Sequence, residues 1–250
     1  MFRHSSRCSI VLALFFLVTI GRSQDRTFSV SATAGITHLN LGDVDEDNQN
    51  DVNGWNSQGI PIGSFPSLKS SFLYSVKGAY RIDRDIAFTV SVARSTHRVT
   101  TEYSEVNQEL LLNRSLGFTD YTVGVLYHFP LYYDIIEGYA GGEAGIMDAY
   151  AHADAFAARL ITIDQDVEVF PYVDTIADYR IRKMILSAVV GANVQVIGPA
   201  FLRIDAQYKF GNAGKMDGHV SRIDSEGDET TSIGFDFSGL ILTFGVSVRF

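Results

Sequence analysis

The chain has 250 residues, 46% of them hydrophobic, and 29 acidic residues against 20 Lys and Arg give a formal net charge of −9. An acidic surface repels phosphates, which makes nucleic acid a poor partner. The length suits one sizeable domain or barrel.

Residues 1–23 read as a cleaved secretory signal peptide. A basic end precedes an apolar core from Cys8 to Ile20, and the small residues Gly21 and Ser23 precede a cut before Gln24. That core is too short to cross a bilayer as a helix. Removing the leader takes away the chain's one cysteine and leaves 17 basic residues against 29 acidic ones, a net charge of −12.

Residues 24–250 contain eight segments in which apolar and polar residues alternate, as they do in β-strands with two different faces. The glycines of the fifth segment blur its alternation and leave its register open. The predicted strands cover about 28–40, 70–82, 86–93, 117–129, 136–147, 182–196, 201–210 and 240–250.

Long and short connections alternate along the chain. Four polar stretches are predicted to be external loops, at about 42–67, 100–114, 148–178 and 211–232. Within the third of them, 161–169 alternates well enough to form an extra hairpin above the barrel. Long external loops, short periplasmic turns and both termini in the periplasm are typical of outer-membrane barrels.

Alternation alone also fits a soluble, lipocalin-like barrel with its apolar face inward. The polar face favours the membrane, because it consists mostly of Ser, Thr, Gly and Ala rather than the Lys and Glu of a solvated surface. Small residues suit the lumen of an eight-stranded barrel, which side chains fill. We therefore predict an all-β, eight-stranded antiparallel up-and-down transmembrane β-barrel.

The last strand carries a second signal. Its Thr243, Gly245, Val248 and terminal Phe250 resemble the C-terminal motif that the barrel insertion machinery reads in outer-membrane proteins. With the leader and the loop asymmetry, residues 27–250 resemble the small barrels of the OmpA/OmpX-like superfamily. The resemblance implies the cell outer membrane as location, with its lipids and lipopolysaccharide as partners, and no peptidoglycan-binding domain after the barrel.

Charges on the inward face must pair, since an unpaired buried charge is costly. We expect a salt-bridged plug, with a narrow ion-conducting barrel as the alternative. The charges form a middle group and a periplasmic group: Lys77, Asp120, Glu143 and Lys209, then Arg81, Arg203 and Arg249.

Asp43, Asp45, Asp47 and Asp51 form the sharpest local motif, with acids at positions one, three, five and nine of a candidate calcium loop. Gly54 stands where an EF-hand has its bidentate Glu, so the spacing is closer to the acidic repeats of thrombospondin type 3. A solvated acidic loop tip is the alternative. No cofactor other than calcium is implied.

Ser95 and His97 share a face near the outer rim, and Glu102 follows, so an outer-membrane barrel enzyme that hydrolyses lipids or esters is an alternative function. The loops favour a non-catalytic structural or surface-binding role with an unidentified surface ligand, because external loops carry recognition. Stretch 42–67 holds five acids and no base, and 148–178 holds seven acids and one base.

Calcium that orders the first loop should slow protease nicking of whole cells, and chelator should remove the protection. The double variant Asp45→Ala, Asp47→Ala should lose the protection as well. Identical nicking with calcium and with chelator would contradict the calcium loop and leave the solvated loop tip as the interpretation.

Overall fold

The computed structural model describes residues 27–41, 50, 52–57, 68–105, 108–133, 135–163, 166–211, 214–222 and 229–250. For 159–163 and 166–174 it describes the backbone alone. Residues 52–57 form a short helical segment. None of the described helical residues belongs to a helix long and apolar enough to cross a membrane.

The described residues otherwise form antiparallel strands with short connections. Their bounds are β1 Phe28–Leu39, β2 Ser70–Arg81, β3 Ile86–Glu105, β4 Gln108–Tyr132, β5 Ile136–Ile163, β6 Asp166–Ile197, β7 Ala200–Phe210, β8 Gly214–Arg222, β9 Glu229–Phe235 and β10 Gly239–Arg249.

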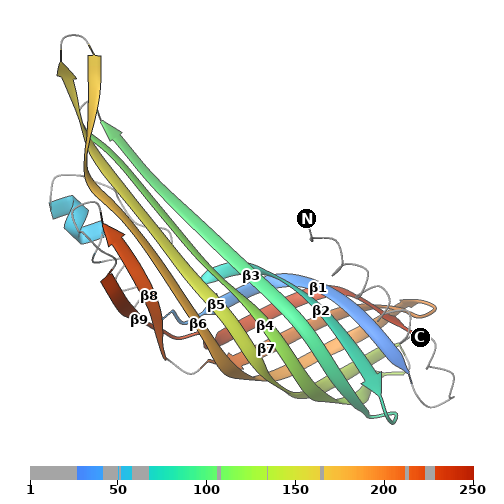
Figure 1. Ribbon diagram of the computed structural model, residues 1–250. Helices are drawn as coiled ribbons and strands as arrows, with labels where there is room; N and C mark the ends of the chain where they lie inside the picture. The colour runs from blue at the N-terminus through green and yellow to red at the C-terminus, as the bar shows by residue number, and fades with distance from the viewer. Residues whose placement is uncertain are drawn as a thin grey trace, which may run out of the picture.

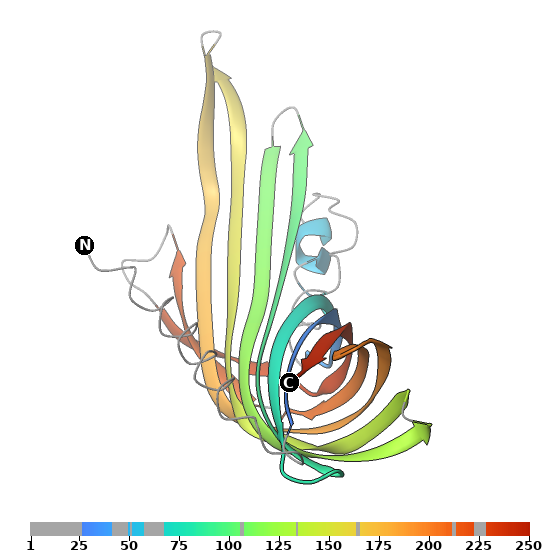
Figure 2. The same cartoon turned by 90° about the vertical axis from the view of Figure 1, so that its right-hand side faces the viewer.

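Eight of these strands close into a ring, which confirms the predicted fold class (Figures 1 and 2). The first strand, β1, pairs with the last, β10, and β5 pairs with β6, so that β1–β7 and β10 complete the circle. Paired residues can be followed from Thr33 in two directions around the ring. Through β2–β5 they lead to Lys183 of β6, and through β10 and β7 they lead to Asn193, ten residues further along the same strand. This offset is the shear, which tilts the strands of a barrel and sets its width.

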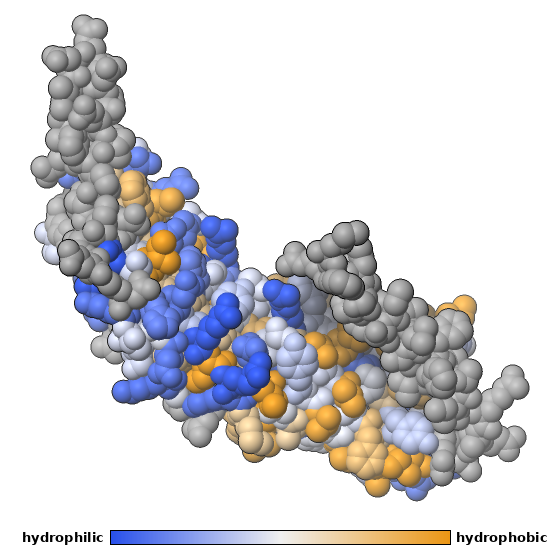
Figure 3. All heavy atoms as spheres, in the orientation of Figure 1, coloured by the Kyte–Doolittle hydropathy of each residue, from blue (hydrophilic) through white to orange (hydrophobic). Residues whose placement is uncertain are grey.

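The outer surface of the ring is an apolar belt, in agreement with the predicted outward face. Each ring strand contributes side chains to it, and many are about half exposed. On the face seen in Figure 3, apolar residues lie over the barrel part of the molecule. Examples from six strands are Ile36 at 58%, Val76 at 57%, Val90 at 62%, Val123 at 61%, Leu186 at 58% and Phe244 at 56%. Apolar surface of this extent around a closed ring is stable in lipid rather than in water.

Glycines set the register of β5, which the sequence left open. Gly141 and Gly145 face inward, where a Cβ atom would lie 2.0 Å from the backbone oxygen of Val125 and 1.9 Å from that of Tyr121. The backbones of β4 and β5 therefore approach too closely at these positions for any other residue.

The prediction that 100–114, 148–178 and 211–232 are loops is wrong, because most of their residues are in strands. Strands β3 and β4 continue to Glu105 and from Gln108, while β5 and β6 stay paired up to Ile163 and Asp166. The predicted hairpin at 161–169 is the tip of this pair. Together with β8 and β9, which flank the outer part of β6, these extensions form a sheet that projects far beyond the barrel (Figures 1 and 2).

The barrel thus has a projecting end and a turn end, where the C-terminus lies (Figure 1). Closure at the turn end depends on the last residue. The Phe250 N–H donates to the Phe28 carbonyl at 2.7 Å, and the Phe28 N–H donates back at 3.3 Å. The predicted leader 1–23 and the stretches 42–49 and 58–67 lie outside the described residues.

Replacing Phe250 with Asp, or deleting it, should lower the amount of folded protein in the membrane fraction severalfold, because β10 must be recognised and must close on β1. Phe250→Tyr keeps the aromatic ring and serves as control. Assembly of Phe250→Asp at the wild-type level would contradict this role, and wild-type protein found soluble in the periplasm would contradict the membrane location itself.

Candidate functional site: a sealed lumen and a projecting sheet

The lumen near the turn end is braced by one carboxylate. Oε2 of Glu137 lies 2.5 Å from Nη2 of Arg81 and 2.7 Å from Nη2 of Arg249. Arg81 also donates to Nδ1 of His128 at 2.8 Å. A guanidinium carries only donors, so Nδ1 of His128 is the acceptor in this contact. Strands β2, β4, β5 and β10 are tied together here.

The middle of the lumen holds two ion pairs: Lys77 lies 2.6 Å from Glu143 across the barrel, and Lys209 contacts Asp120. Arg203 lies 2.9 Å from Asp205. As predicted, Arg203 belongs to the group at the turn end, because it borders the same hollow as Arg81, His128 and Arg249. These side chains are almost entirely shielded from solvent, as the charged lumen predicted from the sequence requires. The expected pairing of the seven predicted lumen charges is confirmed.

Hydroxyl groups complete the charged layer. Glu143 accepts hydrogen bonds from Thr122 at 3.2 Å and Thr89 at 3.4 Å, and Asp205 accepts one from Tyr139. The hollow left among these side chains is about 20 Å³, little more than the volume that one water molecule needs. The charged layer therefore fills its part of the barrel.

An apolar plug closes the lumen on the side of the projecting sheet. Leu73, Phe118, Met147, Ile185 and Ile241 come from five different strands and are each at most 2% exposed. Phe237 packs on Phe118 with ring centroids 6.3 Å apart. Further residues cover this layer from above: Leu39, Leu41, Leu68, Met216 and Phe235. An ion crossing this layer would lose its hydration without gaining a polar partner.

Sequence reasoning missed this plug, although a signal for it was present. Leu73 and Ile241 fall on the inward face of their strands, among Ser and Thr residues. Large apolar residues at inward positions near one end of several strands indicate a plug at that end.

The projecting sheet has two different faces. Its inner face, continuous with the lumen, carries alternate alanines of β5 from Ala149 to Ala157, and Leu110 and Leu112 of β4. Val52 of the helical segment packs against these leucines. The outer face, continuous with the belt, is mostly polar, although it includes the exposed Ile176.

One edge of this sheet ends in β3. Strand β3 pairs with β2 only as far as Thr96, whereas it pairs with β4 up to Glu105. Within the described ranges, no strand borders the other side of residues 97–105. Nine residues of edge backbone are thus presented outside the barrel.

The candidate enzyme residues are not brought together. Ser95 and His97 share the inner face as predicted, but Ser95 donates to the carbonyl of Phe72 at 3.0 Å. Glu102 is exposed on the opposite face of β3. Asp43, Asp45, Asp47 and Asp51 lie outside the described residues, and no cluster of three metal-ligating side chains occurs among those described.

No protein-family model and no curated protein matches the chain. Among solved structures it is similar to Ail, the attachment invasion locus protein of Yersinia pestis, at 14% identity over 91% of this chain and 100% of that one, with a TM-score of 0.46. It is similar to OprG from Pseudomonas aeruginosa at 11%, covering 90% and 95%, with a TM-score of 0.46. A major outer membrane protein from Thermus thermophilus has 13% identity, covering 90% and 99%, with a TM-score of 0.48.

The class of the protein follows from its own architecture. A closed ring of eight antiparallel strands with an apolar belt and a filled lumen is that of a small outer-membrane β-barrel.

Replacing Lys209 with Met should destabilise the barrel by roughly 3–5 kcal/mol, because it leaves the buried Asp120 carboxylate without its cation. Arg182→Met breaks the exposed pair with Asp148 and should cost about 0–1 kcal/mol. Urea unfolding of both variants in lipid vesicles gives the comparison. Equal stabilities would show that the lumen pairs do not brace the barrel.

Proposed function

We propose that this protein is a non-catalytic outer-membrane barrel that holds the sheet of β3–β6 outside the cell as a recognition surface. The turn end then faces the periplasm and the projecting end faces the outside. This orientation follows the usual one of outer-membrane barrels, in which short turns are periplasmic.

The main support for this proposal is the length of the strands. Strands β5 and β6 have 28 and 32 residues, whereas roughly 9–11 tilted residues span the hydrocarbon. The excess adds nothing to the closure of the ring. A rigid paired sheet presents its groups to a partner with less ordering on binding than a free loop would require.

The edge of β3 is the part of this sheet best suited to binding. An edge strand offers unpaired N–H and C=O groups, onto which an extended peptide can add as a further strand. The outward side chains of this edge are polar, with Arg98, Thr100 and Glu102 exposed. We therefore expect the surface ligand to be an extended protein segment.

The sealed lumen argues against the conducting alternative, and the separation of Glu102 from His97 argues against the hydrolase. Large, stable single-channel currents from purified protein in planar bilayers would favour the pore. Hydrolysis of a lipid or ester that is lost on His97→Ala would favour the enzyme.

A truncated variant tests the recognition surface. Residues 101–112 and 153–177 are replaced by two-residue turns, which join the paired positions Thr100 and Asn113, and His152 and Asp178. The barrel, its belt and its plug are retained, so the variant should still assemble in the membrane.

Phage that display random peptides are then selected on vesicles containing either protein. Extended, β-prone peptides should be enriched on the wild type at least tenfold over the truncated barrel. The same peptides recovered from both proteins would contradict a binding role for the projecting sheet.

A further inference from the structure

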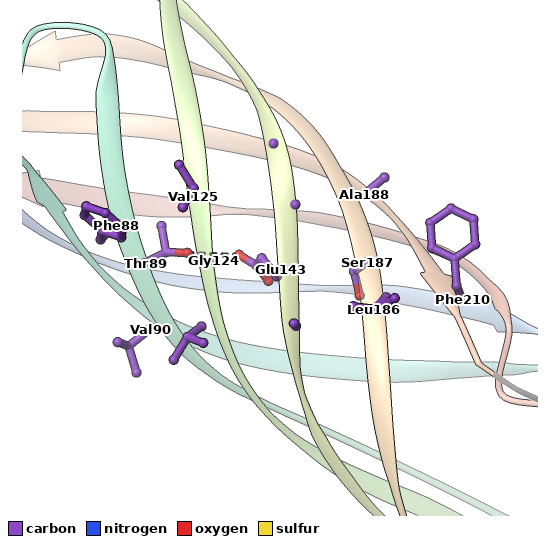
Figure 4. Close-up of a pocket in the computed structure, with 14 residues that line it drawn as sticks. Phe88, Thr89, Val90, Gly124, Val125, Glu143, Leu186, Ser187, Ala188 and Phe210 are labelled. Carbon is purple, nitrogen blue, oxygen red and sulfur yellow. Dashed lines mark hydrogen bonds between the residues drawn. The ribbon is translucent and has the colours of Figure 1, made fainter.

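A hollow interrupts the apolar belt on the outside of β3–β7 (Figure 4). Its volume is about 720 Å³, within the range of small-molecule pockets. The small outward residues Gly142, Ala144 and Ala188 are among those that line it. Phe88 and Phe210 stand at its two sides (Figure 4). The hollow faces the hydrocarbon, so its occupant is apolar.

A patch of arginines lies beyond this hollow, toward the projecting sheet. On β3 the outward residue after Val92 is Arg94, and on β6 the outward residue beyond Met184 is Arg182. Both arginines are exposed, as are Arg180 in the next outward position of β6 and Arg98 in the second outward position beyond Arg94. Arg182 is four residues from Leu186 at the rim of the hollow, roughly 13 Å along the strand.

The register places the two arginines of β3 and the two arginines of β6 on the same outer surface, with β4 and β5 between them. Arg94 pairs with Thr119, Thr119 with Asp148, and Asp148 with Arg182, so three strand spacings, roughly 14 Å, separate the pairs.

The patch is locally positive in an acidic chain. On the outer face of the sheet, Asp148, Asp178 and Asp217 are the acids closest to the arginines, and Asp217 of β8 stands directly opposite Arg180. Asp148 lies 3.2 Å from Arg182, in a pair whose side chains are 48% and 73% exposed, and Asp178 bonds to His152 at 2.8 Å. Four arginines against three acids stand just beyond Val92 and Met184, the outward residues at which the apolar belt ends on β3 and β6, while the whole chain has a net charge of −9.

We propose that the hollow and the arginine patch together form a binding site for a bisphosphorylated, multi-acyl glycolipid of the outer leaflet. Its acyl chains occupy the hollow, and its two phosphates bind the pair Arg94 and Arg98 and the pair Arg180 and Arg182. Guanidinium groups bind phosphate oxygens in a bidentate manner, and the hollow accepts chains that a smooth belt would not hold. The site lies on the opposite face of the sheet from the lumen and does not depend on the edge of β3.

Two variants separate the two halves of the site. Gly142→Leu fills the hollow, and a Cβ atom there meets only the Ser187 carbonyl at 3.6 Å, an ordinary contact. The quadruple variant Arg94→Gln, Arg98→Gln, Arg180→Gln, Arg182→Gln removes the charges outside the belt. The controls are Ala32→Leu, on the lipid face of β1, and Arg84→Gln, in the turn at the other end of the barrel.

Bisphosphorylated lipid A is the probe, titrated onto purified barrel in detergent, and native mass spectrometry counts the bound lipid. The wild type should retain one lipid A, both site variants should weaken binding on the order of tenfold or more, and both controls should stay within about twofold. Should Gly142→Leu fail to fold, Ala144→Leu fills the same hollow, and the arginine variant tests the headgroup alone. Unchanged binding in the site variants would overturn the proposal, and so would equal binding of dephosphorylated lipid A or of phosphatidylglycerol.

Discussion

The whole architecture depends on the need to satisfy every backbone N–H and C=O group inside the hydrocarbon. A sheet meets this need only when it has no edge, so the pairing of β1 with β10 is the contact on which the rest relies. The terminal Phe250 extends this pairing by its bonds to Phe28. Above the membrane, water satisfies the backbone and closure is no longer needed. The ring can open there, and β3 becomes an edge beyond Thr96.

Closing eight strands leaves a lumen that side chains must fill, and the chain fills it in two ways. Near the turn end and in the middle, ion pairs such as Lys77 with Glu143 and Arg249 with Glu137 join strands that are not neighbours. Toward the projecting sheet, leucine, phenylalanine and methionine replace them. The charged layer gives the interior a defined set of partners, and the apolar plug fills the lumen on the side of the projecting sheet. This filling supports our proposal of an anchor and display surface rather than a pore.

The ring strands, their outward faces and the paired lumen charges could be predicted from the sequence, because lipid on one side and a narrow lumen on the other impose a strict period of two. The extensions could not. From Ala149 to Ala157 the inward residues are alanines and the outward ones include Tyr150, His152 and Asp154, a pattern with little apolar contrast and low strand propensity. Outside the membrane both faces meet water or small side chains, so the alternation of apolar and polar residues weakens although the strand continues. The calcium motif at 43–51 lies outside the described residues and stays a prediction.

Single-cysteine labelling along β5 tests most directly whether the belt lies in the membrane and the sheet outside it. Cysteine replaces Ala140, Ala144, Asp148 or His152 in turn, in a Cys8→Ser background, and whole cells are treated with a membrane-impermeant maleimide. The account predicts labelling at positions 148 and 152 and none at 140 and 144, with the change just beyond Ile146. Equal labelling at 144 and 152, or no labelling at any of the four positions, would contradict it.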